Sequence, residues 1–268
     1  MKPLADFPSP MARNLKGVFT DIDDTLTSEG YLPAISYTAM ERLQEAGLIV
    51  VPITGRPAGW CDLVARLWPV NGVVGENGAF YFHYDRKKKK MYRHYADDTD
   101  TKQRNHDRLM RLADMVISNV PGAAISADQA YRETDLAVDF REDVAPLDEN
   151  DVQKIVTLLK SEGATVKVSS IHVNAWFGDY DKLTMTKCFA RDILNLNIDE
   201  HEEKFVFTGD SPNDAPMFRF FTNSIGVANI KAFTDQIEVL PNYITSGFGG
   251  QGFAEVADFL VASRKTGA

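Results

Sequence analysis

Two aspartates follow a buried run of residues at a position where they could take part in chemistry. Residues 18–27 read VFTDIDDTLT, so an apolar stretch leads directly into Asp21 and Asp23. Residues two apart in a strand face the same side, so these carboxylates would repel each other unless a cation lay between them or the chain turned sharply after Asp21. Either arrangement implies a site. Taken alone, Asp-Asp-Thr is also good turn and helix-cap chemistry, so the rest of the chain must decide.

Other polar groups stand at comparable positions along the chain. Thr54 follows a second predicted strand, and its hydroxyl could hold an anion together with the amides of Gly55 and Arg56 at a helix start. The segment GDSPND at 209–214 follows a third strand and holds two carboxylates and an amide, while Lys182 at a helix start adds a cation. The carboxyl ends of parallel strands meet in one crevice of an open α/β sheet, so we expect these groups to converge.

The elements that would position these groups alternate between strand and helix. Before residue 79 we expect strands at 16–21, 48–53 and 72–75, with helices at 35–46 and 57–67. After residue 181 we expect helices at 182–194, 213–221 and 253–263, and strands at 204–208, 224–227 and 243–245, the last at a sheet edge. This alternation predicts the α/β class, as a Rossmann-like doubly wound parallel sheet with helices on both faces.

The middle of the chain follows another pattern. We expect a hairpin at 81–95, helices at 102–119 and about 150–161, and strands at 134–140, 164–169 and 171–177. Such neighbouring strands are typical of an α+β unit. The sequence therefore predicts a core formed by residues 1–79 and 181–268, with an α+β cap domain inserted at residues 80–180.

Composition excludes several classes of protein. The chain has 268 residues, 44% of them hydrophobic, which is enough to build two modest cores. A net charge of −9 argues against nucleic acid as a partner. Polar residues interrupt every apolar run, so we expect no membrane span, no membrane partner and no secretory signal. The basic run 87–90 is interpreted as a solvated hairpin tip rather than an anion-binding patch.

The cysteines and the glycine-rich segment are interpreted as structural. Cys61 and Cys188 lie far apart without metal-ligand spacing, so we expect buried thiols in a reducing cytoplasm. The segment GFGGQG at 247–252 lacks the lysine and hydroxyl residue of a phosphate-binding P-loop. We expect it to be a flexible turn near the rim of the site.

The ordered set of motifs resembles a known superfamily. Residues 21–25 (DIDDT), 54–56 (TGR), Lys182 and 209–214 (GDSPND) are similar to the four motifs of the haloacid dehalogenase superfamily. The insertion between the second and third motifs resembles its type IIB, Cof-like branch, which includes sucrose-phosphate, mannosyl-phosphoglycerate and trehalose-phosphate phosphatases. The resemblance covers nearly the whole chain. It implies a cytoplasmic phosphoric monoester hydrolase, monomeric or homodimeric, whose partner is a small phosphorylated substrate such as a sugar phosphate.

The resemblance also implies roles for the acidic residues. Asp21 would be the nucleophile that forms an aspartyl-phosphate, and Asp23 would protonate the leaving oxygen and later activate water. Mg²⁺ would be held by Asp21, the backbone carbonyl of Asp23, Asp210 and waters. Asp214 would support the metal or the lysine from behind.

The remaining roles concern the phosphoryl group. Thr54, Gly55, Arg56 and Lys182 would bind its oxygens, and Asn213 would contact the phosphoryl or the leaving group. Lys187 is a rival for the lysine role, because the third motif commonly reads Asp-Lys-Gly and here is DKL at 181–183. The helical phase favours Lys182, since it places the apolar residues of that helix on one face.

Two points are left open by the motifs. Family members often have Gly where this chain has Asp24. Two interpretations of Asp24 stay open: an additional carboxylate beside the site, or a solvated residue of the turn. Cap residues could set specificity, and the candidates are Arg132, Glu133, His172 and Asn174.

Two functions compete with the phosphatase. The first is a phosphomutase of the phosphomannomutase type, which shares the scaffold and the cap. The second is a non-catalytic sugar-phosphate binding module, against which the intact set of motif residues counts.

Overall fold

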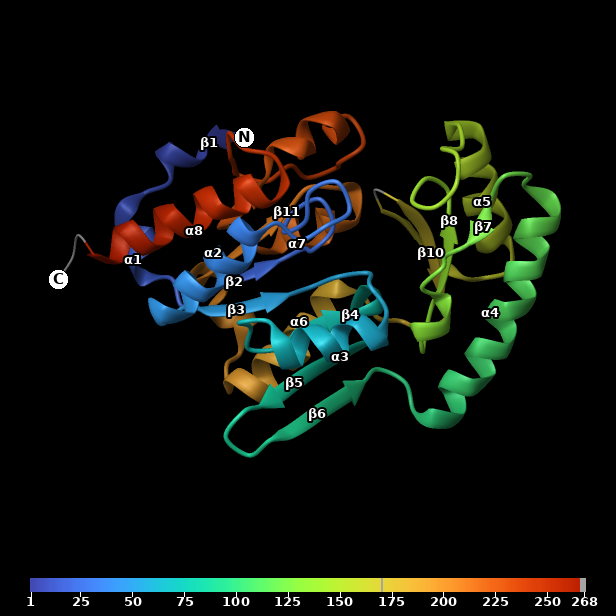
Figure 1. Cartoon of the computed structure of the whole chain (residues 1–268), viewed down its shortest axis with the longest axis horizontal. Coiled ribbons are helices and arrows are strands. Elements are labelled where there is room, and N and C mark those ends of the chain that lie inside the picture. Colours follow the sequence, from blue (N-terminus) through green and yellow to red (C-terminus); the bar gives the residue numbers. More distant parts are fainter. Residues whose placement is uncertain (170, 266–268) are drawn as a thin grey trace.

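A computed structural model describes residues 1–169 and 171–265 of the chain (Figure 1). Its centre is a sheet of parallel strands. In spatial order these are β1 (Lys2–Pro3), β13 (Tyr243–Ile244), β12 (Ser224–Gly226), β11 (Phe205–Gly209), β2 (Gly17–Thr20) and β3 (Ile49–Pro52). The next strand along the chain, β4 (Val73–Gly75), lies beyond β3 through a parallel bridge between Ile53 and Val74. The predicted α/β class is confirmed.

Helices cover both faces of this sheet because successive strand residues point to opposite sides. Val18 of β2 is buried in one apolar cluster, and its neighbour Phe19 is buried in the other. Helices α1 (Ser9–Asn14), α2 (Ala34–Glu45), α3 (Ala58–Leu67) and α8 (Gly249–Lys265) contribute to the first cluster. Helices α6 (Lys182–Leu194) and α7 (Ala215–Phe220) contribute to the second. The sheet is therefore doubly wound.

The inserted segment forms a second layer beside the strand ends, at the right of Figure 1. Its antiparallel sheet has the order β7 (Ala124–Ile125), β8 (Leu136–Asp139), β10 (His172–Trp176) and β9 (Thr165–Val168). Helices α4 (Thr99–Asn119) and α5 (Glu149–Ser161) pack on one face of this sheet and bury their own apolar cluster. Asp98 and Asp148 cap these helices by accepting a backbone amide.

The hairpin that precedes the cap in the sequence bears on the domain boundary expected at residue 80. Strands β5 (Phe80–Asp85) and β6 (Lys90–Tyr95) form the predicted hairpin, and β5 pairs with β4 of the core. Phe80 and Phe82 are buried in the first core cluster. Because these contacts belong to the core, we propose that the cap begins after Tyr95 and ends near residue 180.

The two connections between core and cap run close together. Asn105 Nδ2 donates to Asp97 Oδ2 at 3.3 Å and to the Phe177 carbonyl at 3.2 Å, so it joins the outgoing and the returning chain. Gly78, with φ +105°, lies against the start of α6, and a Cβ there would stand 2.0 Å from the Asp181 carbonyl oxygen. Only glycine fits this crossing.

Two expectations about the end of the chain were wrong. Residues 243–244 are not a sheet edge, because the short strand β1 pairs outside them. The segment 247–252 is not merely a turn, since α8 begins at Gly249. Gly250 and Gly252 allow close packing there, because a Cβ on them would stand 2.2 Å from Ser36 and 2.5 Å from the Gly247 carbonyl oxygen. None of the helices among the described residues is both long enough and apolar enough to cross a bilayer.

Candidate active site

The acidic residues of the first motif lie where strand β2 ends. The Asp21 amide donates to the Thr208 carbonyl of the neighbouring strand at 2.8 Å, which extends the parallel pairing by one residue. The chain then turns, with the amides of Leu26 and Thr27 both donating to the Ile22 carbonyl and Asp24 at φ +56°. This turn sends the side chains of Asp21 and Asp23 into one cavity.

Lys182 connects the acidic groups of two motifs. Asp181 caps α6 by accepting the Thr184 amide at 2.7 Å, which fixes the first turn of the helix. The Lys182 ammonium then lies 2.6 Å from Asp21 Oδ1 and 2.8 Å from Asp214 Oδ1, with all three side chains buried. The rival Lys187 pairs instead with the exposed Asp199. Burial alone would lower the pKa of Lys182, but the charges of Asp21 and Asp214 raise it.

The segment after β11 brings the last motif to the same place. Asp214 Oδ2 accepts the amides of Asp210 at 3.1 Å and Ser211 at 3.4 Å, so its carboxylate shapes the turn. Asp210 Oδ1 accepts the Thr25 hydroxyl at 3.4 Å. Asp210 Oδ2 is buried and has no hydrogen-bond partner within residues 1–169 and 171–265.

This acidic cluster fits a hard cation. Asp21, Asp210 and Asp214 each offer an oxygen within 4.8 Å of the others, whereas Lys182 supplies one positive charge against their three negative charges. Burial raises the pKa of Asp210 well above its ordinary range, and the Asp21 charge adds to this. Burial likewise raises the pKa of Asp21, which Lys182 opposes. A further positive charge would offset the burial and mutual repulsion of these carboxylates and favour their charged form. A donor set made only of oxygens suits Mg²⁺.

The second motif lies beside the nucleophile position. Thr54 is buried and its hydroxyl oxygen accepts the Arg56 amide at 3.0 Å, so that amide is already engaged. The Arg56 side chain lies over the Trp60 ring and donates from Nε to Asp23 Oδ1 at 2.8 Å. Gly55 and Arg56 both line the cavity.

The cavity above Asp21 and Asp23 is closed by the cap. Its volume is about 20 Å³, which is room for about one water molecule. The core lining includes Asn213, whose Oδ1 accepts the Ser211 hydroxyl at 2.7 Å. The cap lining includes Arg132, His172 and Asn174. This cavity alone is too small for a substrate, but Asp23 also lines a larger groove of about 610 Å³ together with Asp210.

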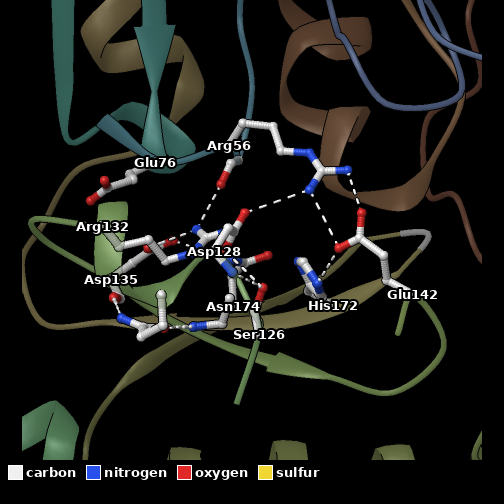
Figure 2. Close-up of polar contacts among 12 residues, drawn as sticks. Arg56, Glu76, Ser126, Asp128, Arg132, Asp135, Glu142, His172 and Asn174 are labelled. Carbon is white, nitrogen blue, oxygen red and sulfur yellow. Dashed lines mark hydrogen bonds and ion pairs between the residues drawn. The ribbon is translucent and has the colours of Figure 1, made fainter. Parts of the chain in front are cut away.

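The cap candidates divide into two groups. Arg132, His172 and Asn174 line the cavity, and their polar contacts are drawn in Figure 2. Glu133 does not line the cavity and pairs with Lys102 at 3.1 Å. Arg132 is held by Asp128 and Asp135 and donates to the Gly55 carbonyl at 2.8 Å.

Two further acidic residues were not found from the sequence. Glu142 of the cap accepts a hydrogen bond from Arg56 Nη2 at 2.8 Å (Figure 2). Glu76 of the core accepts the backbone amides of Glu133 and Thr134 in the cap. Neither belongs to a motif or a periodic pattern. The Glu-Asn-Gly turn signal at 76–78 was the one available hint of a special backbone, and both Glu76 and Asn77 have positive φ.

Comparison with known proteins gives consistent results. Residues 18–162 match a family model described as haloacid dehalogenase-like hydrolase. The chain is 24% identical over 254 residues to a phosphoglycolate phosphatase of Methanosarcina mazei, covering 91% of this chain and 96% of the relative. A phosphoglycolate phosphatase of Methanospirillum hungatei is 24% identical over 245 residues, with 90% and 95% covered.

Solved structures share the fold. The Thermoplasma acidophilum 0175 structure superposes with a TM-score of 0.68 at 18% identity, covering 92% of this chain and 98% of that one. The sucrose-phosphatase of Synechocystis, in complex with sucrose and phosphate, superposes with a TM-score of 0.62 at 13% identity, covering 92% and 98%. The chain therefore shares its fold with these two solved structures.

Proposed function

The chain belongs to the haloacid dehalogenase-like hydrolases and is a phosphatase, and on that premise we propose that it is a Mg²⁺-dependent enzyme acting on a small phosphorylated metabolite, first of all a sugar phosphate. The proposal rests on one arrangement. Lys182 holds Asp21 at 2.6 Å beside the bare oxygen of Asp210. This supports a nucleophile, a cation and an oxygen ligand for a metal lying close together, with Asp21 lining the small cavity and Asp210 the adjoining groove.

The proposed reaction has two steps. An oxygen of Asp21 attacks phosphorus and the ester oxygen departs, which leaves an aspartyl-phosphate and an alcohol. Asp23 gives its proton to the departing oxygen, and in the second step it takes a proton from the water that attacks phosphorus. Phosphate then leaves and the Asp21 carboxylate is restored.

The surrounding residues support these steps. Lys182 and Thr54 would bind phosphoryl oxygens as charge develops, and Asn213 lines the same cavity. Asp21, Asp210 and the backbone carbonyl of Asp23 would hold Mg²⁺. Asp214 would position these groups indirectly, because it accepts hydrogen bonds from Lys182 and from the amides of Asp210 and Ser211. Bound Mg²⁺ would offset the repulsion between the carboxylates and the phosphate dianion.

A sugar leaving group is supported by the space beside the closed cavity. A groove of about 610 Å³ adjoins Asp23 and Asp210 and is lined by Arg141, Phe233 and Phe248. Its volume lies in the range of ordinary small-molecule sites. Polar and aromatic groups together suit a sugar ring.

A phosphorylated hydroxy acid is the second candidate substrate. The curated relatives are phosphoglycolate phosphatases, and the cap side of the closed cavity carries Arg132 and His172 close to Arg56. Cationic and donor groups of this kind suit a carboxylate on the leaving group. A panel that contains sugar phosphates and 2-phosphoglycolate separates the two classes.

Phosphate release tests the function itself. We expect Mg²⁺-dependent hydrolysis of p-nitrophenyl phosphate and of at least one ester in the panel, and loss of at least about 1,000-fold in kcat for Asp21→Asn. Lys187→Ala, which changes a lysine of the same helix outside the cavity, is the matched control and keeps its rate. Equal rates for wild type and Asp21→Asn would refute the proposal.

Two measurements address the competing functions. Phosphorus NMR of the product distinguishes a phosphatase, which releases free phosphate, from a phosphomutase, which yields an isomeric ester. Calorimetry with ligand would favour a binding module if it found tight binding without turnover. We further propose a reducing, cytoplasmic setting and a monomeric or homodimeric state, and the free thiols of Cys61 and Cys188 support the former.

A further inference from the structure

We propose that Glu142 of the cap is a positioning residue that orients Asp23 through Arg56 when the cap is closed. This role rests on the proposed phosphatase function, and it would make the proton transfer by Asp23 depend on closure of the cap. Figure 2 shows the contacts of Arg56 with Glu142 and Asp128 of the cap.

Arg56 contacts carboxylates from both domains. Its Nε donates to Asp23 Oδ1 at 2.8 Å, its Nη2 donates to Glu142 Oε1 at 2.8 Å, and its Nη1 lies 3.5 Å from Asp128 Oδ2. Asp23 belongs to the core, whereas Glu142 and Asp128 belong to the cap. A guanidinium is a rigid planar fork, so fixing its Nη end also fixes the direction of Nε.

The cap holds Glu142 in a defined place. The buried Asp139 accepts the amides of Arg141, Glu142 and Asp143 at 2.8 to 2.9 Å, which fixes the loop after β8. His172 Nε2 lies 2.9 Å from Glu142 Oε2, the oxygen that Arg56 Nη1 also contacts at 3.4 Å. Burial opposes ionisation, but the contacts with His172 and Arg56 lower the pKa of Glu142 to about 2. The carboxylate is therefore charged at neutral pH.

Arg56 has fewer constraints from the core. Apart from Asp23, its side chain has the Trp60 ring, with the guanidinium carbon 4.6 Å from the ring centre. A guanidinium stacked on an aromatic ring can rotate in its own plane while it stays over the ring. Opening the cap removes Glu142 and Asp128, so it removes the contacts that set the angle of the fork.

This arrangement gives Asp23 a fixed orientation only in the closed state. Arg56 occupies Oδ1, which leaves Oδ2 to carry the proton for the leaving oxygen. The orientation of the Asp23 carboxyl would then depend on the contact between Glu142 and Arg56.

The dependence on leaving group tests the inference. An alkyl phosphate needs a proton on its departing oxygen, whereas p-nitrophenolate departs without one. We expect Glu142→Gln to lower kcat about 10- to 100-fold with an alkyl phosphate substrate of the wild type and less than about threefold with p-nitrophenyl phosphate. The change keeps the size of the side chain and removes its charge.

Two other variants complete the experiment. Glu133→Gln is the matched control, because this cap carboxylate pairs with Lys102 away from Arg56 and should leave both rates unchanged. Arg56→Lys keeps the charge but lacks the fork, so it should show the same selective loss. The double variant should lose no more than the larger single loss, because both changes break one path.

The outcomes separate the inference from the proposed function. Equal losses with both esters, or a rise in KM with kcat unchanged, would overturn the positioning role of Glu142 while leaving the phosphatase intact. A wild type that hydrolyses neither ester with Mg²⁺ would overturn the proposed function, and the inference with it.

Discussion

Glu76, at the end of a core strand, accepts both the backbone amide and the hydroxyl of Thr134 in the cap. The same carboxylate accepts the amide of Ala58 at 2.8 Å and of Glu133 at 3.0 Å. One buried side chain thus joins the start of α3 to the cap turn. Burial, followed by the charge of Asp135, raises the pKa of Glu76 to about 7.

This pKa predicts a pH dependence of stability. Below pH 4.5, the ordinary pKa of the group, Glu76 is protonated in folded and unfolded chains alike. Between pH 4.5 and about 7 the unfolded chain releases the proton first, so the free energy of unfolding falls as pH rises. Relative to Glu76→Gln, we expect a fall of up to about 3 kcal/mol across that window, measured by urea unfolding. Parallel pH curves for the two proteins would contradict this.

Removing Lys182 should destabilise the fold as well as stop turnover. Lys182→Ala leaves the buried carboxylates of Asp21 and Asp214 without their counterion, so we expect a loss of about 3–5 kcal/mol in unfolding free energy. Lys187→Ala removes one partly exposed pair with Asp199 and should cost under about 1 kcal/mol. Denaturant unfolding of both variants measures the two losses in unfolding free energy. Similar losses for Lys182→Ala and Lys187→Ala would contradict the role of Lys182 as the buried counterion.

Asp210 should govern the response to metal. We expect Mg²⁺ to raise the melting temperature of the wild type and to do so much less for Asp210→Asn, because binding to the folded state alone stabilises it. Without metal the same variant should melt above the wild type, since it removes a buried carboxylate whose negative charge is repelled by Asp21 and Asp214. Asp199→Asn, at an exposed carboxylate that pairs with Lys187, is the control. A Mg²⁺ response of Asp210→Asn equal to that of the wild type would exclude this site.

Gly78 should be intolerant of a side chain. Gly78→Ala brings a Cβ to 2.0 Å from the Asp181 carbonyl, so the start of α6 must shift and Lys182 with it. We expect a loss of more than about 2 kcal/mol in stability. Gly163→Ala shares the positive φ but meets nothing within 4 Å, so it should cost only about 1 kcal/mol. The difference between the two melting curves is the measurement.

The strand ends could be predicted from the sequence because each depends on a local pattern. The run ending at Asp21 is apolar and short, and parallel strands carry their following residues to one edge. The phase of α6 selected Lys182 over Lys187, and the structure places the former 2.6 Å from Asp21. The expected helix bounds 182–194 agree with α6.

The contacts between core and cap could not be predicted in the same way. Glu142 and Arg56 are 86 positions apart, and no periodicity marks either residue. Strand β1 was missed because its two residues carry no alternation, which is why Tyr243 was expected at an edge. The start of α8 was missed because glycines lower helix propensity, while close packing favours them there.

The contact made by Asn105 has a consequence for protein engineering. Because the outgoing chain at Asp97 and the returning chain at Phe177 meet on one side chain, the ends of the inserted segment lie next to each other. The core could thus be rejoined by a short linker across that point, and a foreign module with adjacent termini could be grafted there. The cap is in this sense an exchangeable cassette, and the core's sheet need not be redesigned to accept another.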